Sequence, residues 1–126
     1  MLRFRRMSQR RIALGKIGED LACDELERRG YVIVARRYRC RGGELDIIAH
    51  DGATLVFVEV KARDGHAFGE AAEAVTPRKQ RRIVRLALEY VMRQHLKDCP
   101  CRFDVVSIHF DAGRSVIEVY QNAFHA

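Results

Sequence analysis

The sequence predicts one α/β domain in which a helix is followed by three strands, a second helix and two further strands. Apolar residues recur at helical spacing over residues 12–29 and again over residues 77–96, and these segments are the expected helices. Short apolar runs bounded by turn residues are the expected strands. Between two of these runs, Asp51-Gly52 is a strong hairpin signal. With 126 residues, the chain suits a single domain with a modest core.

The first helix is expected from about Ile12 to Arg29, and Gly30 is a plausible residue to end it. Its apolar stripe consists of Leu14, Ile17, Leu21, Ala22 and Leu26. Gly15 and Gly18 are costly inside a helix, so they indicate that the helix approaches a sheet or a ligand closely.

Five segments have the composition of strands. They are Tyr31–Ala35, residues 43–50, residues 55–61, Arg102–Phe110 and Ser115–Tyr120. Residues 62–75 are expected to form a loop, after which Thr76 is the N-cap of the second helix and Pro77 its first residue. The first turns of this helix are basic, which favours either a docked anion or a solvent-facing surface.

The predicted hairpin gathers charged side chains on one face. With Asp51 and Gly52 as the turn residues, Asp46 lies opposite Phe57 and Glu44 lies opposite Glu59. Lys61 shares the face of Glu59, because side chains alternate along a strand. Carboxylates at this range repel one another, and a divalent cation is the usual remedy. The alternative is that these are ordinary charges at strand ends, and an odd-length loop would put the two acids on opposite faces.

The positive charge of the chain is concentrated in three clusters. The net charge is +6, and the basic residues gather in residues 1–11, 36–41 and 78–85. Arginine predominates, and its planar fork suits phosphate. Three basic clusters around an acidic site favour a nucleic-acid partner, although each cluster alone could be a solvated face. An anionic membrane surface is the weaker option, since no long basic amphipathic helix is evident near the basic tail.

The first eleven residues hold five arginines and no acid, and they are expected to form a flexible basic arm ahead of a single domain over residues 12–126. This segment lacks the apolar stretch of a signal peptide, and no apolar run in the chain is long enough to span a bilayer, so a cytoplasmic location is predicted. The four cysteines and five histidines lack zinc-site or dithiol spacing, and the thiols are expected to be reduced.

Several motifs follow one another in an order that is specific as a set. They are Gly18-Glu19, Gly30-Tyr31, Gly43-Glu44-Leu45-Asp46-Ile47-Ile48-Ala49, Val56-Phe57-Val58-Glu59-Val60-Lys61-Ala62-Arg63, Phe68-Gly69, Val75 with Lys79, Arg102-Phe103-Asp104-Val105-Val106 and Asn122-Ala123-Phe124. Together they resemble the uncharacterised YraN-like family of the PD-(D/E)XK nuclease superfamily, and they are similar in pattern to archaeal Holliday-junction resolvases. The resemblance implies a restriction-endonuclease-like fold, a mixed β-sheet of about five strands flanked by helices.

The resemblance also implies a set of catalytic residues. Asp46 matches the motif aspartate, although Leu45 replaces the proline of the superfamily name, and Glu59-Val60-Lys61 matches the E-x-K element. Asp46, Glu59 and the carbonyl of Val60 would hold Mg²⁺ or Mn²⁺, and Lys61 would orient the attacking water or offset charge on the phosphate. Glu19 matches the helix acid and would hold a further water or a second metal.

The implied function is a divalent-metal-dependent nuclease that hydrolyses phosphodiester bonds in DNA, with branched DNA as one option. The expected nucleic-acid contacts are Lys79, Arg78, Arg82, Arg36, Arg37, Arg41 and Arg63. The alternatives are a non-catalytic nucleic-acid-binding module with the same fold and a scaffold for a partner protein. A homodimer is an option by analogy with the resolvases. Glu44 is either an auxiliary ligand or a structural partner of Arg41, and the structural role is favoured.

Overall fold

The computed structural model describes the backbone of residues 2–64 and 75–126, and the side chains from residue 13 onward in those ranges. Its elements are α1 (Leu2–Arg28), β1 (Val32–Cys40), β2 (Gly43–Asp51), β3 (Thr54–Asp64), α2 (Pro77–Arg93), β4 (Cys101–Asp111) and β5 (Arg114–Phe124). This order confirms the predicted α/β class. Most of the predicted loop over residues 62–75, with its Phe68-Gly69 motif, lies outside the described residues.

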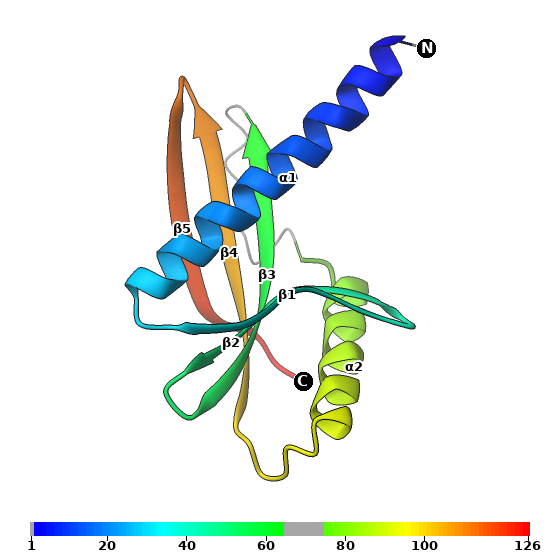
Figure 1. Cartoon of the computed structure of the whole chain (residues 1–126), viewed down its shortest axis with the longest axis vertical. Coiled ribbons are helices and arrows are strands. Elements are labelled where there is room, and N and C mark those ends of the chain that lie inside the picture. The colour runs from blue at the N-terminus through cyan, green and yellow to red at the C-terminus, as the bar shows by residue number, and fades with distance from the viewer. Residues whose placement is uncertain (1, 65–74) are drawn as a thin grey trace.

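The five strands form one sheet in the order β1-β2-β3-β4-β5. Neighbouring strands are antiparallel except β3 and β4, which are parallel, so the sheet is mixed as predicted. A parallel pair needs a crossover between its strands, and the segment that contains α2 provides it. β1 and β2 are turned strongly relative to β3, β4 and β5 (Figure 1).

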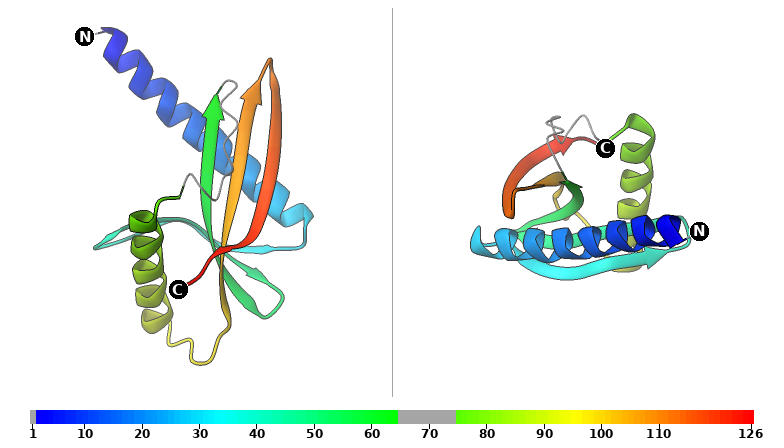
Figure 2. Two further views of the ribbon diagram at one scale, coloured as in Figure 1. Left: turned by 180° about the vertical axis from the view of Figure 1, so that it is seen from behind. Right: turned by 90° about the horizontal axis from the view of Figure 1, so that it is seen from above.

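The two helices cover opposite faces of the sheet. Ala22, Cys23 and Leu26 of α1 pack on the side chains Ile47, Ala49, Val56, Val58, Val106 and Ile108. α2 packs Ile83, Leu86, Ala87 and Tyr90 on the alternate residues of the same strands, among them Ile48, Leu55, Phe57, Phe103 and Val105. Alternation of side chains along each strand produces these two separate cores. Seen from behind in Figure 2, β3, β4 and β5 lie in front of α1.

The element boundaries differ from the prediction at both ends of the chain. α1 begins at Leu2, so the predicted start at Ile12 is wrong, and residues 2–11 continue the helix. Leu, Arg, Met and Gln in this segment are good helix formers, and neither glycine nor proline interrupts them. The strands are longer than predicted, since β1 continues to Cys40 and β5 to Phe124.

The turn of the β2–β3 hairpin also differs from the prediction. Asp51 pairs with Thr54 and Ile48 pairs with Phe57, so the turn residues are Gly52 and Ala53, and the predicted pairs Asp46–Phe57 and Glu44–Glu59 are wrong. Gly52 has φ +59°, and glycine is preferred at the first central position of a II′ turn. The pairing partner of each paired β2 residue moves by two positions along β3, and a shift of two keeps the paired side chains from Ile47 to Asp51 on their predicted faces.

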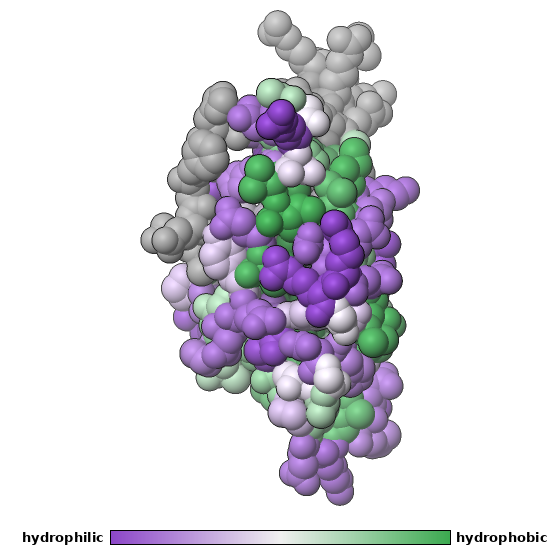
Figure 3. Space-filling view, turned by 90° about the vertical axis from the view of Figure 1, so that its left-hand side faces the viewer, coloured by the Kyte–Doolittle hydropathy of each residue, from purple (hydrophilic) through white to green (hydrophobic). Residues whose placement is uncertain are grey.

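Charged residues make up 32% of the sequence, and hydrophilic residues cover much of the face shown in Figure 3. On the face shown in Figure 3, hydrophobic side chains gather in the upper half and hydrophilic ones surround them. No helix among the described residues is long and apolar enough to cross a membrane.

Gly18 lies where α1 approaches β3, since a Cβ on it would lie 2.7 Å from Cβ of Ala62, whereas a Cβ on Gly15 would have no neighbour within 4 Å. We expect Gly18→Ala to lower the free energy of unfolding by about 1–3 kcal/mol, because overpacking outweighs the gain in helix propensity. Gly15→Ala should raise it by up to about 1 kcal/mol. Urea unfolding of both variants measures this, and equal effects would contradict the close approach.

Candidate functional site

The candidate site lies where β2 and β3 separate. Their pairing ends at Ile47 and Val58, whereas β3 continues to pair with β4 as far as Asp64. Asp46 is the next residue of β2, and its Oδ2 accepts a hydrogen bond from the backbone N–H of Val60 at 2.9 Å. The carboxylate thus replaces a main-chain acceptor that β3 has lost at this point. This bond fixes Asp46 directly over β3.

A local irregularity of β2 sets the direction of Asp46. Leu45 belongs to the α2-side core together with Ile48, but Ile47 belongs to the α1-side core. Residues 45 and 47 would share a face in a regular strand, so the alternation breaks at Asp46. On the neighbouring strand β1, Arg37 has a backbone φ of +51°, a left-handed conformation that residues other than glycine rarely adopt. The sheet is therefore distorted on both strands at the site.

Glu59 is the second acid of the site, and its side chain is only 8% exposed. Burial is the main cause that raises the pKa of Asp46 to about 7, and the negative charge of neighbouring Glu59 is the next cause. The hydrogen bond from Val60 opposes this rise. Asp46 and Glu59 are therefore close enough that two negative charges are costly without a cation between them.

Two lysines accompany the two acids. Nζ of Lys79 lies 2.6 Å from Oε1 of Glu59, and this ion pair joins α2 to β3. Burial lowers the pKa of Lys61, and the ammonium of Lys79 lowers it further. Burial acts to lower the pKa of Lys79, but the pKa is raised overall. The hydrogen bond to Glu59 is the largest of the effects that raise it. Lys61 is thus the lysine that releases its proton more easily than an ordinary lysine.

The start of α2 positions Lys79. The structure confirms Thr76 as the N-cap, with Pro77 in the first turn, and Oγ1 of Thr76 accepts a hydrogen bond from the backbone N–H of Lys79 at 3.2 Å. Ile83 and Leu86 anchor the following turns in the core. The helix is therefore held at its first turn and along its buried face, which fixes Lys79 beside Glu59.

A basic hollow borders the site on α2. It has a volume of about 470 Å³ and is lined by Thr76, Arg78, Lys79, Arg81, Arg82 and Arg85. The four arginines are exposed, and the partial positive charge of the helix N-terminus adds to theirs. Of the nucleic-acid contacts predicted from the sequence, Arg78, Lys79 and Arg82 are brought together here. Arg81 and Arg85, which belong to the same basic cluster, complete the set.

Glu19 is placed differently from the three other predicted catalytic residues. Its carboxylate pairs with Nε of Arg36 at 3.1 Å and Nε of Arg37 at 3.0 Å, and Arg36 also pairs with Asp20. No hydrogen bond among the described residues joins Glu19 to Asp46, Glu59 or Lys61. Arg36 and Arg37, two of the six arginines predicted to bind nucleic acid, are thus engaged with acids of α1.

The other predicted basic residues lie around the site. Glu44 pairs with Arg39 at 3.4 Å, whereas the sequence suggested Arg41 as its structural partner. Arg41 is exposed in the turn between β1 and β2. Arg63 is half-buried on β3 and shares the face of Lys61, two residues earlier. Of these, only Arg63 lies on the same strand face as the acidic site.

Sequence reasoning missed a buried network around Asp104, which is 0% exposed. Arg102 donates to both carboxylate oxygens of Asp104, at 2.9 and 3.0 Å, and to Asp51 at 2.8 Å. The hydroxyl of Tyr31 donates to Asp104 at 2.8 Å, and burial together with this bond raises the pKa of Tyr31. The network ties the sheet together, and the signal for it was an acid inside the apolar run of β4.

The oxygen donors of the site suit magnesium or manganese. Within the described residues, no three side chains of His, Cys, Asp or Glu gather as a metal cluster. Asp46 and Glu59 are two neighbouring carboxylates of the kind that could hold such an ion. Mg²⁺ binds through one or two carboxylates and keeps several waters, so this small set fits it.

The comparisons with known proteins all point to one family. A sequence model of the Uncharacterised protein family UPF0102 matches residues 18–108. A UPF0102 protein of Symbiobacterium thermophilum is 50% identical over 114 residues, which are 90% of this chain and 97% of that protein. UPF0102 proteins of Geobacter metallireducens and Geobacter sulfurreducens are 48% and 52% identical over 118 and 114 residues. The matched residues are 94% of this chain and 97% of the Geobacter metallireducens protein. For the Geobacter sulfurreducens protein they are 88% of each. The names of these relatives state no activity.

The raised pKa of Asp46 gives a pH-dependent stability. Its pKa is about 7 in the folded protein, against an ordinary value of 3.8. The protonated carboxyl therefore contributes its full stability below pH 3.8, and this contribution is lost as the pH rises through 7. Asn keeps the protonated, neutral form. In metal-free buffer, Asp46→Asn should therefore gain stability over the wild type between about pH 4 and 7, by at most about 4 kcal/mol, and gain no more above.

Urea unfolding across this pH range measures the difference. Asp24→Asn, which changes an exposed acid of α1, is the matched control and should show no such trend. A pH-independent effect of Asp46→Asn would mean that the pKa of Asp46 is the same in the folded and the unfolded protein, and would contradict the raised value.

Proposed function

We propose that this chain, which belongs to the uncharacterised protein family UPF0102, is a divalent-metal-dependent nuclease that hydrolyses phosphodiester bonds in DNA. One observation carries the proposal. Two neighbouring carboxylates, Asp46 and Glu59, lie beside Lys61 and Lys79, at the border of a basic hollow. Metal-assisted phosphodiester hydrolysis uses carboxylates that hold a divalent cation and positive groups that stabilise the charge of the phosphate.

Asp46 and Glu59 would hold the metal together with the carbonyl of Val60. A bound Mg²⁺ or Mn²⁺ would lower the pKa of an attacking water and offset the charge of the phosphate. The hydrogen bond from Val60 N–H to Asp46 Oδ2 keeps that carboxylate in place and leaves Oδ1 available as a ligand atom. Both oxygens of Glu19 are engaged by arginines, so we place Glu19 outside the metal-binding set.

The two lysines would have different roles. Lys61, with its lowered pKa, is suited to orient the attacking water and to accept its proton as the water oxygen bonds to phosphorus. The bond from phosphorus to the leaving oxygen breaks in the same step, and that oxygen takes up a proton from solvent water. Lys79 keeps its charge and joins the acids to the hollow, so it is suited to hold the scissile phosphate. Arg78 and Arg82 would bind neighbouring phosphates of the strand.

The second candidate function is a nucleic-acid-binding module without catalysis. The ion pair between Lys79 and Glu59 favours it, because it satisfies Glu59 without any metal. Among the described residues Asp46 makes no such ion pair, and its pKa stays raised although the charge of Lys79 acts to lower it. A further cation would relieve its repulsion with Glu59. For this reason the nuclease is the function that the site supports better.

The first test compares metal binding with cleavage. Asp46→Asn should abolish Mn²⁺ binding and cleavage, because a ligand is lost. Lys61→Ala should retain Mn²⁺ binding and reduce turnover about 100-fold or more, as expected for loss of proton transfer. Calorimetry with Mn²⁺ and a panel of linear, flapped and four-way DNA and RNA substrates measure these effects.

In the same assays, Asp24→Asn is the control for the loss of one acid. If the wild type binds no Mn²⁺ even with nucleic acid present, or if Asp46→Asn cleaves as well as the wild type, the nuclease proposal is wrong. Binding without cleavage in every metal would leave the binding module in its place.

The second test concerns the basic hollow. Log affinity for duplex DNA should fall linearly with log salt, with a slope of about −0.9 for each phosphate neutralised. Arg78→Ala and Arg82→Ala together should make that slope shallower by roughly 2 if each arginine contacts one phosphate. Arg93→Ala, at the far end of α2 and paired with Glu89, should leave the slope unchanged. An equal change in all variants would contradict a specific role of the hollow.

A further inference from the structure

We propose that a groove between α2 and the end of β5 binds an unpaired nucleobase of the nucleic acid that the basic hollow holds. The proposal rests on the proposed function, because it takes nucleic acid as the partner, but it needs no cleavage. It assigns a preference for single-stranded or branched nucleic acid to named residues outside the acidic site.

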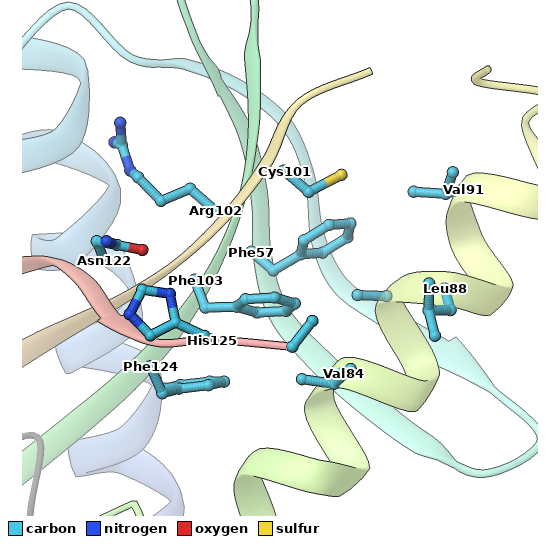
Figure 4. Close-up of a pocket in the computed structure, with 12 residues that line it drawn as sticks. Phe57, Val84, Leu88, Val91, Cys101, Arg102, Phe103, Asn122, Phe124 and His125 are labelled. Carbon is cyan, nitrogen blue, oxygen red and sulfur yellow. The ribbon is translucent and has the colours of Figure 1, made fainter. Parts of the chain in front are cut away.

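The inner part of the groove is an apolar cavity of about 130 Å³ (Figure 4). One wall consists of three stacked phenylalanines, with ring centroids 5.7 Å apart for Phe57 and Phe103 and 5.1 Å apart for Phe103 and Phe124. Val84 and Leu88 of α2 lie across the cavity from them. Such walls suit a flat, weakly solvated ligand.

Polar groups stand at the rim of this cavity. Asn122 and His125 line it on the side away from α2 and can exchange hydrogen bonds with the edge of a base (Figure 4). Arg102 also lines it, but its guanidinium is engaged by Asp51 and Asp104. An apolar interior with polar groups at the edge fits the faces and edge of a nucleobase better than it fits a purely aliphatic ligand.

The groove is continuous with the basic hollow. Val84 and Leu88 also line a neighbouring hollow of about 320 Å³, whose other walls include Arg81 and Arg85. The same two arginines line the basic hollow beside Lys79. One surface thus offers positive charge at one end and apolar contact at the other. A nucleotide has the matching order, with a charged phosphate and a base of low polarity, and this complementarity identifies the occupant.

The base must be unpaired to enter. Lys79 and Leu88 are nine positions apart on one helix, so they lie about 13 Å apart along its axis and on opposite sides of it. A strand that reaches both must cross α2 at Arg81 and Arg85, which line both of the hollows in between. A base inside a duplex is stacked and paired, and it reaches a protein pocket only when it leaves the stack. Unpaired bases in single strands, flaps and junctions leave the stack at a small cost in free energy.

Leu88 and Met92 provide a matched pair of variants. Both are exposed apolar residues of α2, at 58% and 75%, but only Leu88 lines the groove. Since both are exposed, their replacement by Ala should leave the fold intact, which far-UV circular dichroism and the thermal midpoint verify. Leu88→Gln is a second variant that keeps the size of the side chain and removes its apolar surface.

The experiment measures binding of the full chain in EDTA to a single strand and to a blunt duplex of equal length, by fluorescence anisotropy. The wild type should bind the single strand more tightly. Leu88→Ala and Leu88→Gln should weaken single-strand binding roughly tenfold, near the low end of the loss per stacked base. Their duplex binding should not change, and Met92→Ala should match the wild type on both probes.

A 2-aminopurine base placed along the single strand should change its fluorescence on binding at one position, and this change should disappear in Leu88→Gln. Equal affinity for the two probes, or no effect of the Leu88 variants, would overturn the proposal. So would a loss of dimer in Leu88→Gln by sedimentation without a change in binding, since the groove would then hold a second copy. Because no metal is present, loss of cleavage in other assays leaves this result unaffected.

Discussion

The hydrogen bond from the backbone of Val60 to Asp46 is the contact on which the site depends. It forms where the pairing of β2 with β3 has ended, so no regular backbone hydrogen bonds hold the two strands together there. Glu59 and Lys61 are the immediate neighbours of Val60, and the bond therefore also sets the distance from Asp46 to both. A chain that lost this bond would keep its sheet through β3 and β4 but would lose the geometry of its acids.

The two acids of the site are not neutralised equally, and this difference determines which of them most needs a further cation. Lys79 is held by the N-cap of α2 and neutralises Glu59, while Asp46 is left with a half-buried carboxyl whose pKa lies near 7. A divalent cation relieves the repulsion at Asp46, and it must also compete with Lys79 for Glu59. The ion pair between Lys79 and Glu59 also explains why a binding module is the alternative, because it neutralises Glu59 without a metal.

Local signals in the sequence predicted those parts that local chemistry determines. Thr76-Pro77 gave the start of α2, and Glu59-Val60-Lys61 gave the charged end of β3. The turn of the hairpin was not predicted correctly, and the break in the alternation of β2 at Asp46 was not predicted either, because nothing local marks where β2 leaves its regular pairing with β3. The left-handed conformation at Arg37 has no local signal, and the ion pairs of Glu19 depend on contacts between distant segments. The bonds of Arg102 to Asp51 and Asp104 likewise arise only when β2 and β4 are placed in one sheet.

α2 connects the chemistry of the site to the selection of a ligand. Its first turn carries Lys79 to the acids, its exposed arginines form the basic hollow, and Leu88 stands in the groove beyond them. All three features lie on one helix whose buried face packs Ile83 and Leu86 in the core, so their spacing is set by the helix. A ligand that satisfies all of them must present a phosphate near the acids, further phosphates along the helix and an apolar group at a set distance. If the two proposals hold, the geometry of this one helix favours a nucleic acid with an unpaired base over a regular duplex.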